Sequence, residues 1–78
     1  MKTLTQIFNI LSKQQKRLVG TNYYTSLSSH SKEDNSFFAM AIQNNNEVIY
    51  YDTYNIRYNN LDERLDKLIA FVSRLLIK

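Results

Sequence analysis

The chain has 78 residues, a net charge of +3 and neither cysteine nor proline. A chain of this length buries only roughly 60% of the surface that its unfolded form exposes, so residues 1–78 are expected to form a single domain. The lack of cysteine excludes disulfides and thiolate metal sites and makes the cytoplasm the expected compartment. The longest apolar run, residues 68–72, is far below the ~20 residues that span a bilayer, so we expect no membrane partner.

Residues 3–19 carry the first helical pattern. Thr3 and Gln6 have the spacing of a capping box, in which each side chain bonds the backbone N–H of the other residue. Gly20, the only glycine, stands where a left-handed residue would end the helix. The basic residues fall on the side opposite to the apolar face. That face comprises Leu4, Ile7, Phe8, Leu11, Leu18 and Val19.

The middle of the chain predicts three strands. Residues 21–29 alternate and are rich in tyrosine and hydroxyl side chains, which indicates a polar edge strand. A loop over residues 30–35, containing His30, is expected to turn this strand back. Further strands are predicted over residues 36–43 and 47–54, because β-branched and aromatic residues alternate on both sides of an asparagine turn. That turn consists of Asn44, Asn45 and Asn46.

The sequence leaves two registers open for this hairpin. A three-residue turn pairs Met40 with Tyr50, whereas a two-residue turn pairs Met40 with Ile49. We favour the first, which places the small residues Ala39 and Ala41 opposite larger ones. The choice matters because a slip of one residue moves a strand's side chains to the other face of the sheet. In either register both faces of the hairpin carry large apolar groups.

A second helix is predicted from Asn60, which forms another capping-box pattern with Glu63. Its apolar stripe recurs at spacings of four and three residues. The order of elements is therefore helix, three strands, helix, which predicts a two-layer α+β domain. In this fold both helices pack on one face of a three-stranded antiparallel meander. The stripe of the second helix comprises Leu61, Leu65, Leu68, Val72 and Leu75.

Side chains that could carry catalysis are scarce. His30 is the only histidine and falls in a polar loop, where a solvated role is the expectation. Glu33, Asp34 and Asp52 could offer oxygens to a hard cation, but they follow no spacing typical of a metal loop. A single glycine leaves no phosphate-cradling loop. We therefore predict a protein that is not an enzyme and has no catalytic residue, metal or cofactor.

Six tyrosines carry most of the remaining functional information. A tyrosine buries an apolar ring and leaves its hydroxyl wet, which suits protein interfaces as well as half-covered sheets. If the sheet face away from the helices is an aromatic surface, we expect it to bind another macromolecule. The favoured partner is a protein, either a larger host protein or a second copy in a homodimer. The expected contact residues are Tyr50, Tyr54, Arg57 and Tyr58.

A nucleic acid is the alternative partner, because the charge is segregated along the chain. Residues 1–32 carry five basic side chains and no acid, whereas residues 33–66 carry seven acids and two bases. Phosphate would meet the basic group while the tyrosines stack on bases. The lysines of the first helix are expected on the layer opposite the open sheet face, which counts against this alternative. The basic group comprises Lys13, Lys16, Arg17 and Lys32.

The order of elements, with residues 39–50 (AMAIQNNNEVIY) between two capped helices, resembles small phage-encoded inhibitors. Some anti-CRISPR proteins of type II systems have this arrangement of helix, three strands and helix. The resemblance covers most of the chain and implies a compact binder that blocks a larger host protein by steric occlusion, in the host cytoplasm if the gene is a phage gene. Those inhibitors mimic DNA through many acidic side chains. This sequence is basic, so neither that mechanism nor any functional residue is transferred.

Overall fold

The structure has the predicted elements in the predicted order. The computed structural model describes residues 2–33 and 35–77. The three strands form one antiparallel sheet in the order β1-β2-β3, so the predicted α+β class is confirmed. The elements are α1 (Leu4–Arg17), β1 (Tyr23–Lys32), β2 (Asn35–Asn44), β3 (Glu47–Tyr54) and α2 (Leu61–Leu76).

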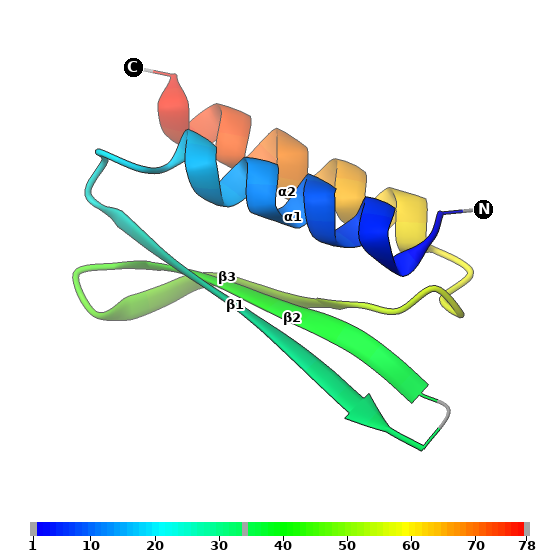
Figure 1. Ribbon diagram of the computed structural model, residues 1–78. Helices are drawn as coiled ribbons and strands as arrows, with labels where there is room; N and C mark the ends of the chain where they lie inside the picture. The colour runs from blue at the N-terminus through cyan, green and yellow to red at the C-terminus, as the bar shows by residue number, and fades with distance from the viewer. Residues whose placement is uncertain (1, 34, 78) are drawn as a thin grey trace.

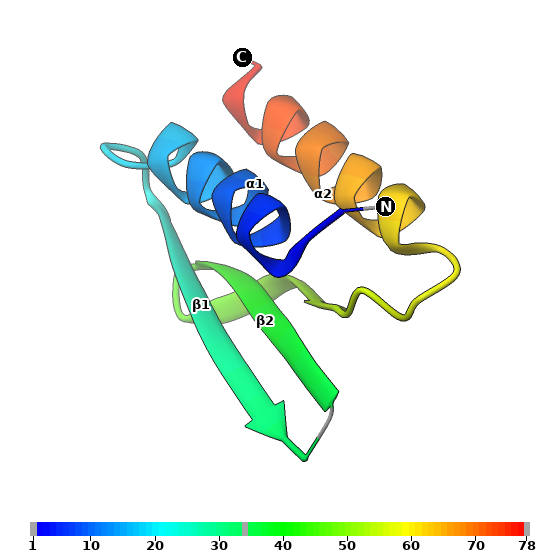
Figure 2. The same cartoon turned by 45° about the vertical axis from the view of Figure 1, so that its right-hand side comes forward.

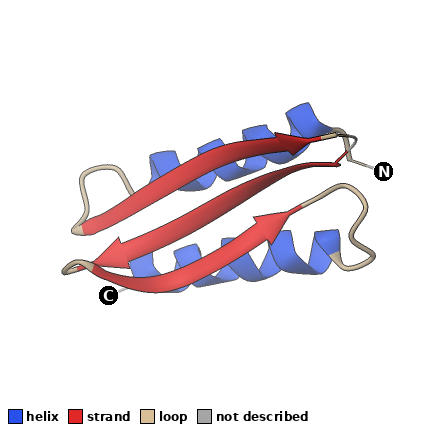
Figure 3. Cartoon of the chain, turned by 90° about the horizontal axis from the view of Figure 1, so that it is seen from below, coloured by secondary structure: helices blue, strands red, loops and turns tan. Residues whose placement is uncertain are grey.

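The two helices lie side by side on one face of the sheet (Figure 1). They run in the same direction because the chain reverses four times between them, at the two hairpins and at the two connections between helix and sheet. α1 lies on the β1 side of the sheet and α2 on the β3 side (Figure 2). The far end of the β1–β2 hairpin extends beyond the helices. No described element covers the opposite face of the sheet (Figure 3).

The core lies between these two layers. Met40 and Ile42 of β2 are completely buried against the helices, as is Tyr54 of β3. Because side chains alternate across a strand, the residues between them point to the open face. The helices contribute a stripe of buried side chains from each side: Ile7, Leu11 and Leu18 from α1 and its cap, and Leu61, Leu65, Leu68 and Val72 from α2.

The start of α1 confirms the predicted capping box. The N–H of Gln6 donates to Thr3 Oγ1 at 3.1 Å, and the N–H of Thr3 donates to Gln6 Oε1 at 2.8 Å. Gly20 follows the end of the helix with a φ of +83°. The expectation for the buried face was wrong at three positions, since Leu4 is 37% exposed, Phe8 45% and Val19 78%. Leu4 and Phe8 lie on one flank of α1, and Val19 lies in the turn after the helix.

The stripe of α2 is buried as predicted from Leu61 to Val72 and half-buried at Leu75, but its capping box is not formed. Asn60 precedes the helix without a side-chain bond to the backbone. Its amide oxygen instead accepts from Arg64 Nε at 3.1 Å. The second capping box was therefore a wrong prediction, because Asn60 bonds a side chain one turn on in place of the Glu63 backbone.

β1 and β2 are longer than predicted. The expected loop over residues 30–35 was wrong, because β1 continues to Lys32 and β2 begins at Asn35. Within the described residues the turn holds Glu33, whose φ is +54°. Ten consecutive pairs join the two strands without interruption, from Tyr23 opposite Asn44 to Lys32 opposite Asn35.

Neither predicted register of the β2–β3 hairpin is correct. Asn45 and Asn46 form a two-residue turn in which both φ angles are positive, 54° and 65°, as type I′ hairpin turns require. The register then shifts between Ile42 and Gln43, so Ile42 lies opposite Tyr50 while Gln43 lies opposite Val48. This bulge adds one residue to β3. Side chains 40 and 50 thereby share a face, as in the favoured register.

Candidate functional site

The open face of the sheet is the strongest candidate site. It is made of the residues that alternate with the buried ones, and it has large side chains at its ends and small ones at its centre. Tyr24 and Tyr51 are 79% and 63% exposed, and Val48 is 52% exposed. The register places five small side chains beside Tyr51, between the end that holds Tyr24 and Val48 and the end that holds Phe37. They are Ser26, Ser28, Ala39, Ala41 and Thr53.

His30 belongs to this face and not to a loop, which corrects the sequence prediction. Its ring stacks on Phe37, its partner across the β1–β2 pair, with 4.9 Å between the ring centroids and 17° between the planes. Its Nε2 lies 2.9 Å from Ser28 Oγ. The imidazole ring is therefore held nearly parallel to the apolar ring of Phe37. His30 lies two residues before the end of β1 at Lys32.

Two of the four predicted protein-binding residues face the helices. Tyr54 is fully buried, so its assignment to a contact surface was wrong. Tyr50 points to the same side, where its ring packs on Phe71 of α2 with 4.8 Å between centroids. Both are opposite buried residues of β2, which is why they share the core face. The structure thus assigns the open face to Tyr24 and Tyr51 instead.

Burial changes the ionisation of both core tyrosines. Desolvation raises the pKa of Tyr54 far above its usual value, and the nearby Tyr50 and Asp52 add to this effect. Burial also raises the pKa of Tyr50. The Tyr54 hydroxyl interacts weakly with the Tyr50 phenol but makes no well-formed hydrogen bond with a described residue. These phenols therefore stay protonated and belong to the packing of the core.

Tyr58 and Arg57 lie in the segment between β3 and α2. The ring of Tyr58 lies under the guanidinium of Arg64, 4.5 Å from its centroid, and its hydroxyl lies 2.9 Å from Thr53 Oγ1. Tyr58 is half-buried by these contacts. Arg57 is exposed, and its N–H donates to Asn55 Oδ1 at 2.9 Å. These two residues lie at the β3 side of the sheet.

The four basic residues of the nucleic-acid alternative are not brought together. Lys13 and Lys16 are exposed on α1, in the helical layer. Arg17 is turned toward α2, where it donates to Ser73 Oγ at 3.0 Å, and it also donates to Gln14 Oε1 of its own helix at 2.8 Å. Lys32 lies at the far end of the β1–β2 hairpin. The lysines of α1 are thus on the layer opposite the exposed tyrosines, as expected.

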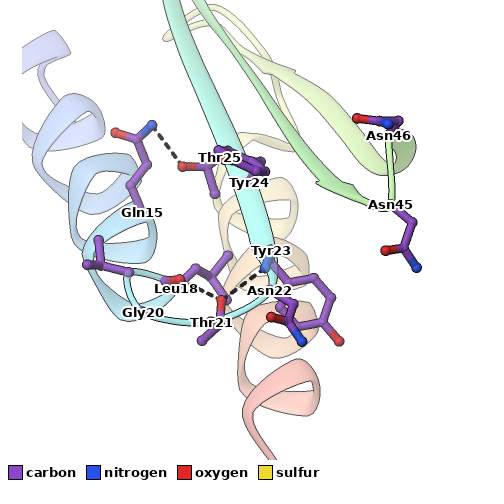
Figure 4. A pocket seen from close by; sticks show the side chains of 11 residues that line it. Gln15, Leu18, Gly20, Thr21, Asn22, Tyr23, Tyr24, Thr25, Asn45 and Asn46 are labelled. Atoms are coloured by element: carbon purple, nitrogen blue, oxygen red, sulfur yellow. Dashed lines mark hydrogen bonds between the residues drawn. The ribbon is translucent and has the colours of Figure 1, made fainter.

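A cleft of about 620 Å³ opens at the end of the molecule where α1 meets β1 (Figure 4). Gln15 of α1 donates to Thr25 Oγ1 at 3.2 Å across it, and Thr21 caps the last turn through a bond to the Leu18 carbonyl. The lining combines amides, hydroxyls and phenol rings with the apolar residues Leu18 and Val19. It includes Tyr24 and the asparagine turn at residues 45–46. Its lining contains no acid, base or thiol that could act as a nucleophile or proton carrier.

The acidic residues considered from the sequence as a cation site are not brought together. Glu33 lies at the tip of the first hairpin, whereas Asp52 lies within β3 and is bonded to Arg64. Asp34 lies outside the described residues. In the part of the chain that the structure describes, no three histidine or acidic side chains gather as metal ligands.

The comparisons with known proteins found no matching family model, no matching curated protein and no matching solved structure. Neither α1 nor α2, the helices of the described chain, combines the length and the hydropathy of a membrane-crossing helix.

Sequence reasoning missed Tyr24 and Tyr51 as site residues. The signal that could have found them is the two-residue alternation, because Ala41 lies opposite Tyr51 and Gln43 opposite Tyr24. Once Met40 is placed in the core, its neighbours Ala39 and Ala41 must face outward. The side chains opposite them then define the open face.

Proposed function

We propose that this protein is a non-enzymatic protein-binding module that docks its open sheet face on a larger protein and blocks it by steric occlusion. The observation that carries the proposal is the open face itself, where Tyr24, Tyr51 and Val48 are exposed beside a centre of small side chains. Aromatic residues are enriched at the core of protein interfaces and charged residues are depleted there. The partner surface is accordingly apolar and uncharged.

The charge on this face supports a protein partner over a nucleic acid. Between Tyr24 and His30 on β1, and between Phe37 and Gln43 on β2, there is no lysine, arginine or acid. Phosphate binding needs cations beside the stacking rings, and the exposed lysines of α1 belong to the other layer. That the target is a host protein of a phage or mobile element stays a prediction of the sequence resemblance.

The test compares two matched double variants. Tyr24→Ser/Tyr51→Ser removes the exposed rings of the open face, whereas Lys13→Gln/Lys16→Gln removes two charges from the helical layer. A protein captured from a lysate by the wild type is purified, and its affinity for each variant is measured by calorimetry. We expect the tyrosine variant to lose at least tenfold in affinity and the lysine variant to bind as the wild type does. Equal binding by the tyrosine variant would overturn the proposal.

Nucleic-acid binding is the second candidate, favoured by the exposed Lys13 and Lys16 on a helix without acidic residues. Such binding weakens steeply as salt is added, because phosphate contacts release counterions. The measurement is fluorescence anisotropy of a labelled single-stranded oligonucleotide at several salt concentrations. This candidate fails if the protein does not bind at low salt, or if the lysine double variant binds as tightly as the wild type.

A further inference from the structure

A different surface of the molecule, the free edge of β1, is built to accept another strand. β1 is an outer strand of ten residues that pairs with β2 on one side only. The unpaired N–H and C=O groups of an edge strand are a template for a further strand, and proteins usually protect them with prolines, charges, bulges or short strands. None of these devices occurs from Tyr23 to Ser31, where the pairing is unbroken and there is no lysine, arginine or acid. One backbone donor at the start of the strand is already used, since the N–H of Tyr23 donates to Thr21 Oγ1 at 3.2 Å.

The other edge of the same sheet, on β3, is protected, so β1 is the edge that remains available to another strand. β3 carries the bulge that follows the asparagine turn. The N–H of Thr53 donates to Asp52 Oδ1 at 2.8 Å, so this backbone donor is already satisfied. Asp52 is held by Arg64 of α2, and the hydroxyls of Thr53 and Tyr58 lie 2.9 Å apart. Side chains from the adjacent loop and helix therefore close the β3 edge.

An apolar flank of α1 lies beside the free edge of β1. At ~100° per residue, Leu4, Phe8 and Gln15 fall within about 40° of one another on the helix. Gln15 reaches Thr25 of β1, which places this flank on the β1 side, and the Phe8 ring lies 5.7 Å from that of Phe38 on the neighbouring strand β2. Leu4 and Phe8 are 37% and 45% exposed. Val19, in the turn after α1, lines the same cleft as Thr25 and is 78% exposed.

We propose that a second copy of this chain binds here, with the two β1 strands paired antiparallel about a twofold axis near Leu27. The two three-stranded sheets would join into one six-stranded sheet, and the two α1 helices would lie antiparallel above the seam. The axis sets Thr25 opposite Ser29 and Tyr23 opposite Ser31 of the other copy, so no like charges meet within the ladder. It also brings the Leu4 end of one α1 toward the Val19 end of the other.

The α1 flank is what favours a second copy over an extended peptide. A peptide strand would satisfy the backbone of β1 but would leave Leu4, Phe8 and Val19 in water. A second copy supplies the same apolar flank from the other side, as a twofold interface requires. A ten-residue strand is roughly 33 Å long, and with a helix above it two such edges bury on the order of 1,000 Å², the lower range of specific interfaces.

The test is the mass of the protein in solution over a range of concentrations, measured by light scattering and sedimentation. The wild type is expected to shift from 9.3 kDa toward twice that mass as concentration rises. Ser29→Pro removes a backbone N–H from β1 and should raise the dimer dissociation constant at least tenfold. Ser29→Ala is the matched control and should dimerise as the wild type does. Circular dichroism verifies that each variant is folded.

A second measurement does not depend on the proline variant. Amide hydrogen exchange of the wild type at low and high concentration should show added protection in β1 and none in β3. The open-face change Tyr51→Ser lies on β3, away from the paired edge, and should still dimerise, which separates this proposal from the proposed function. A wild type that stays at 9.3 kDa up to millimolar concentration overturns the inference, as does a dimer that Tyr51→Ser abolishes and Ser29→Pro does not.

Discussion

Arg64 of α2 reaches Asp52 of β3 and so ties the end of the sheet to the first turn of the second helix. The pair is partly covered, with the side chains 31% and 19% exposed, and the guanidinium also lies over the ring of Tyr58. Three chain segments meet at this arginine. It joins the helical layer to the sheet through a partly buried ion pair.

Arg64→Ala should therefore destabilise the protein by about 2 kcal/mol, because it leaves a half-buried carboxylate unpaired and removes the stacking on Tyr58. Urea denaturation measures the loss. A double-mutant cycle with Asp52→Asn should give a coupling free energy on the order of 1 kcal/mol. Lys67→Ala is the control, since its exposed pair with Glu63 at 3.7 Å is worth little. Equal losses from Arg64→Ala and Lys67→Ala would contradict this assignment.

The layered fold follows from the sequence because the helical stripes are long and regular. Leu61, Leu65, Leu68 and Val72 are all buried, as their spacing requires. The hairpin tip was mistaken for a loop because β1 leaves the cover of the helices there. Without a core beside it, the segment around His30 has no apolar alternation to distinguish a strand from a loop.

The register of the β2–β3 hairpin and the contact residues were missed for two separate reasons. A bulge at residue 49 is marked by no distinctive residue type, because Val48 and Ile49 are equally suited to a regular strand. The contact residues Tyr50 and Tyr54 were selected by residue type and not by strand face. Placing Met40 in the core would have assigned both to the buried side.

Tyr54→Phe should stabilise the protein by about 1 kcal/mol. The Tyr54 side chain is fully buried, and its hydroxyl makes no well-formed hydrogen bond with a described residue, only a weak interaction with the Tyr50 phenol, so the substitution keeps the ring and removes a poorly satisfied polar group. The midpoint of urea denaturation should rise. Tyr51→Phe alters an exposed hydroxyl and serves as the control, with no expected change. A loss of stability in Tyr54→Phe would mean that a water or another group satisfies this hydroxyl.

Gly20→Ala should cost about 1–2 kcal/mol through the backbone alone. The φ of +83° is unfavourable for a residue with a Cβ, although nothing lies within 4 Å of the position that the Cβ would take. Gly20→Asn should cost less, because asparagine tolerates left-handed angles better. Thermal denaturation of the two variants separates strain from crowding. If asparagine costs more than alanine, side-chain size and not φ is the cause.

The pKa of Asp62 should lie below its usual value, because Lys2 bonds the carboxylate at 2.7 Å. A depressed carboxyl pKa adds stability above the unfolded value of 3.8, and this contribution is lost as the pH falls through the folded pKa. NMR titration of the Asp62 carboxyl carbon measures the shift. Lys2→Gln should return the pKa toward 3.8. An unchanged titration in that variant would show that Lys2 is not the cause.

Asn46→Gly should stabilise the second hairpin by about 0.5–1 kcal/mol, because glycine is the preferred second residue of a type I′ turn and Asn46 has a φ of 65°. Asn44→Gly is the matched control. Asn44 is paired with Glu47 at the end of β2, so glycine there should weaken the strand and lower stability. Urea denaturation of both variants tests the turn. If both substitutions destabilise the protein equally, the two-residue turn at Asn45 and Asn46 is not the one that the chain adopts in solution.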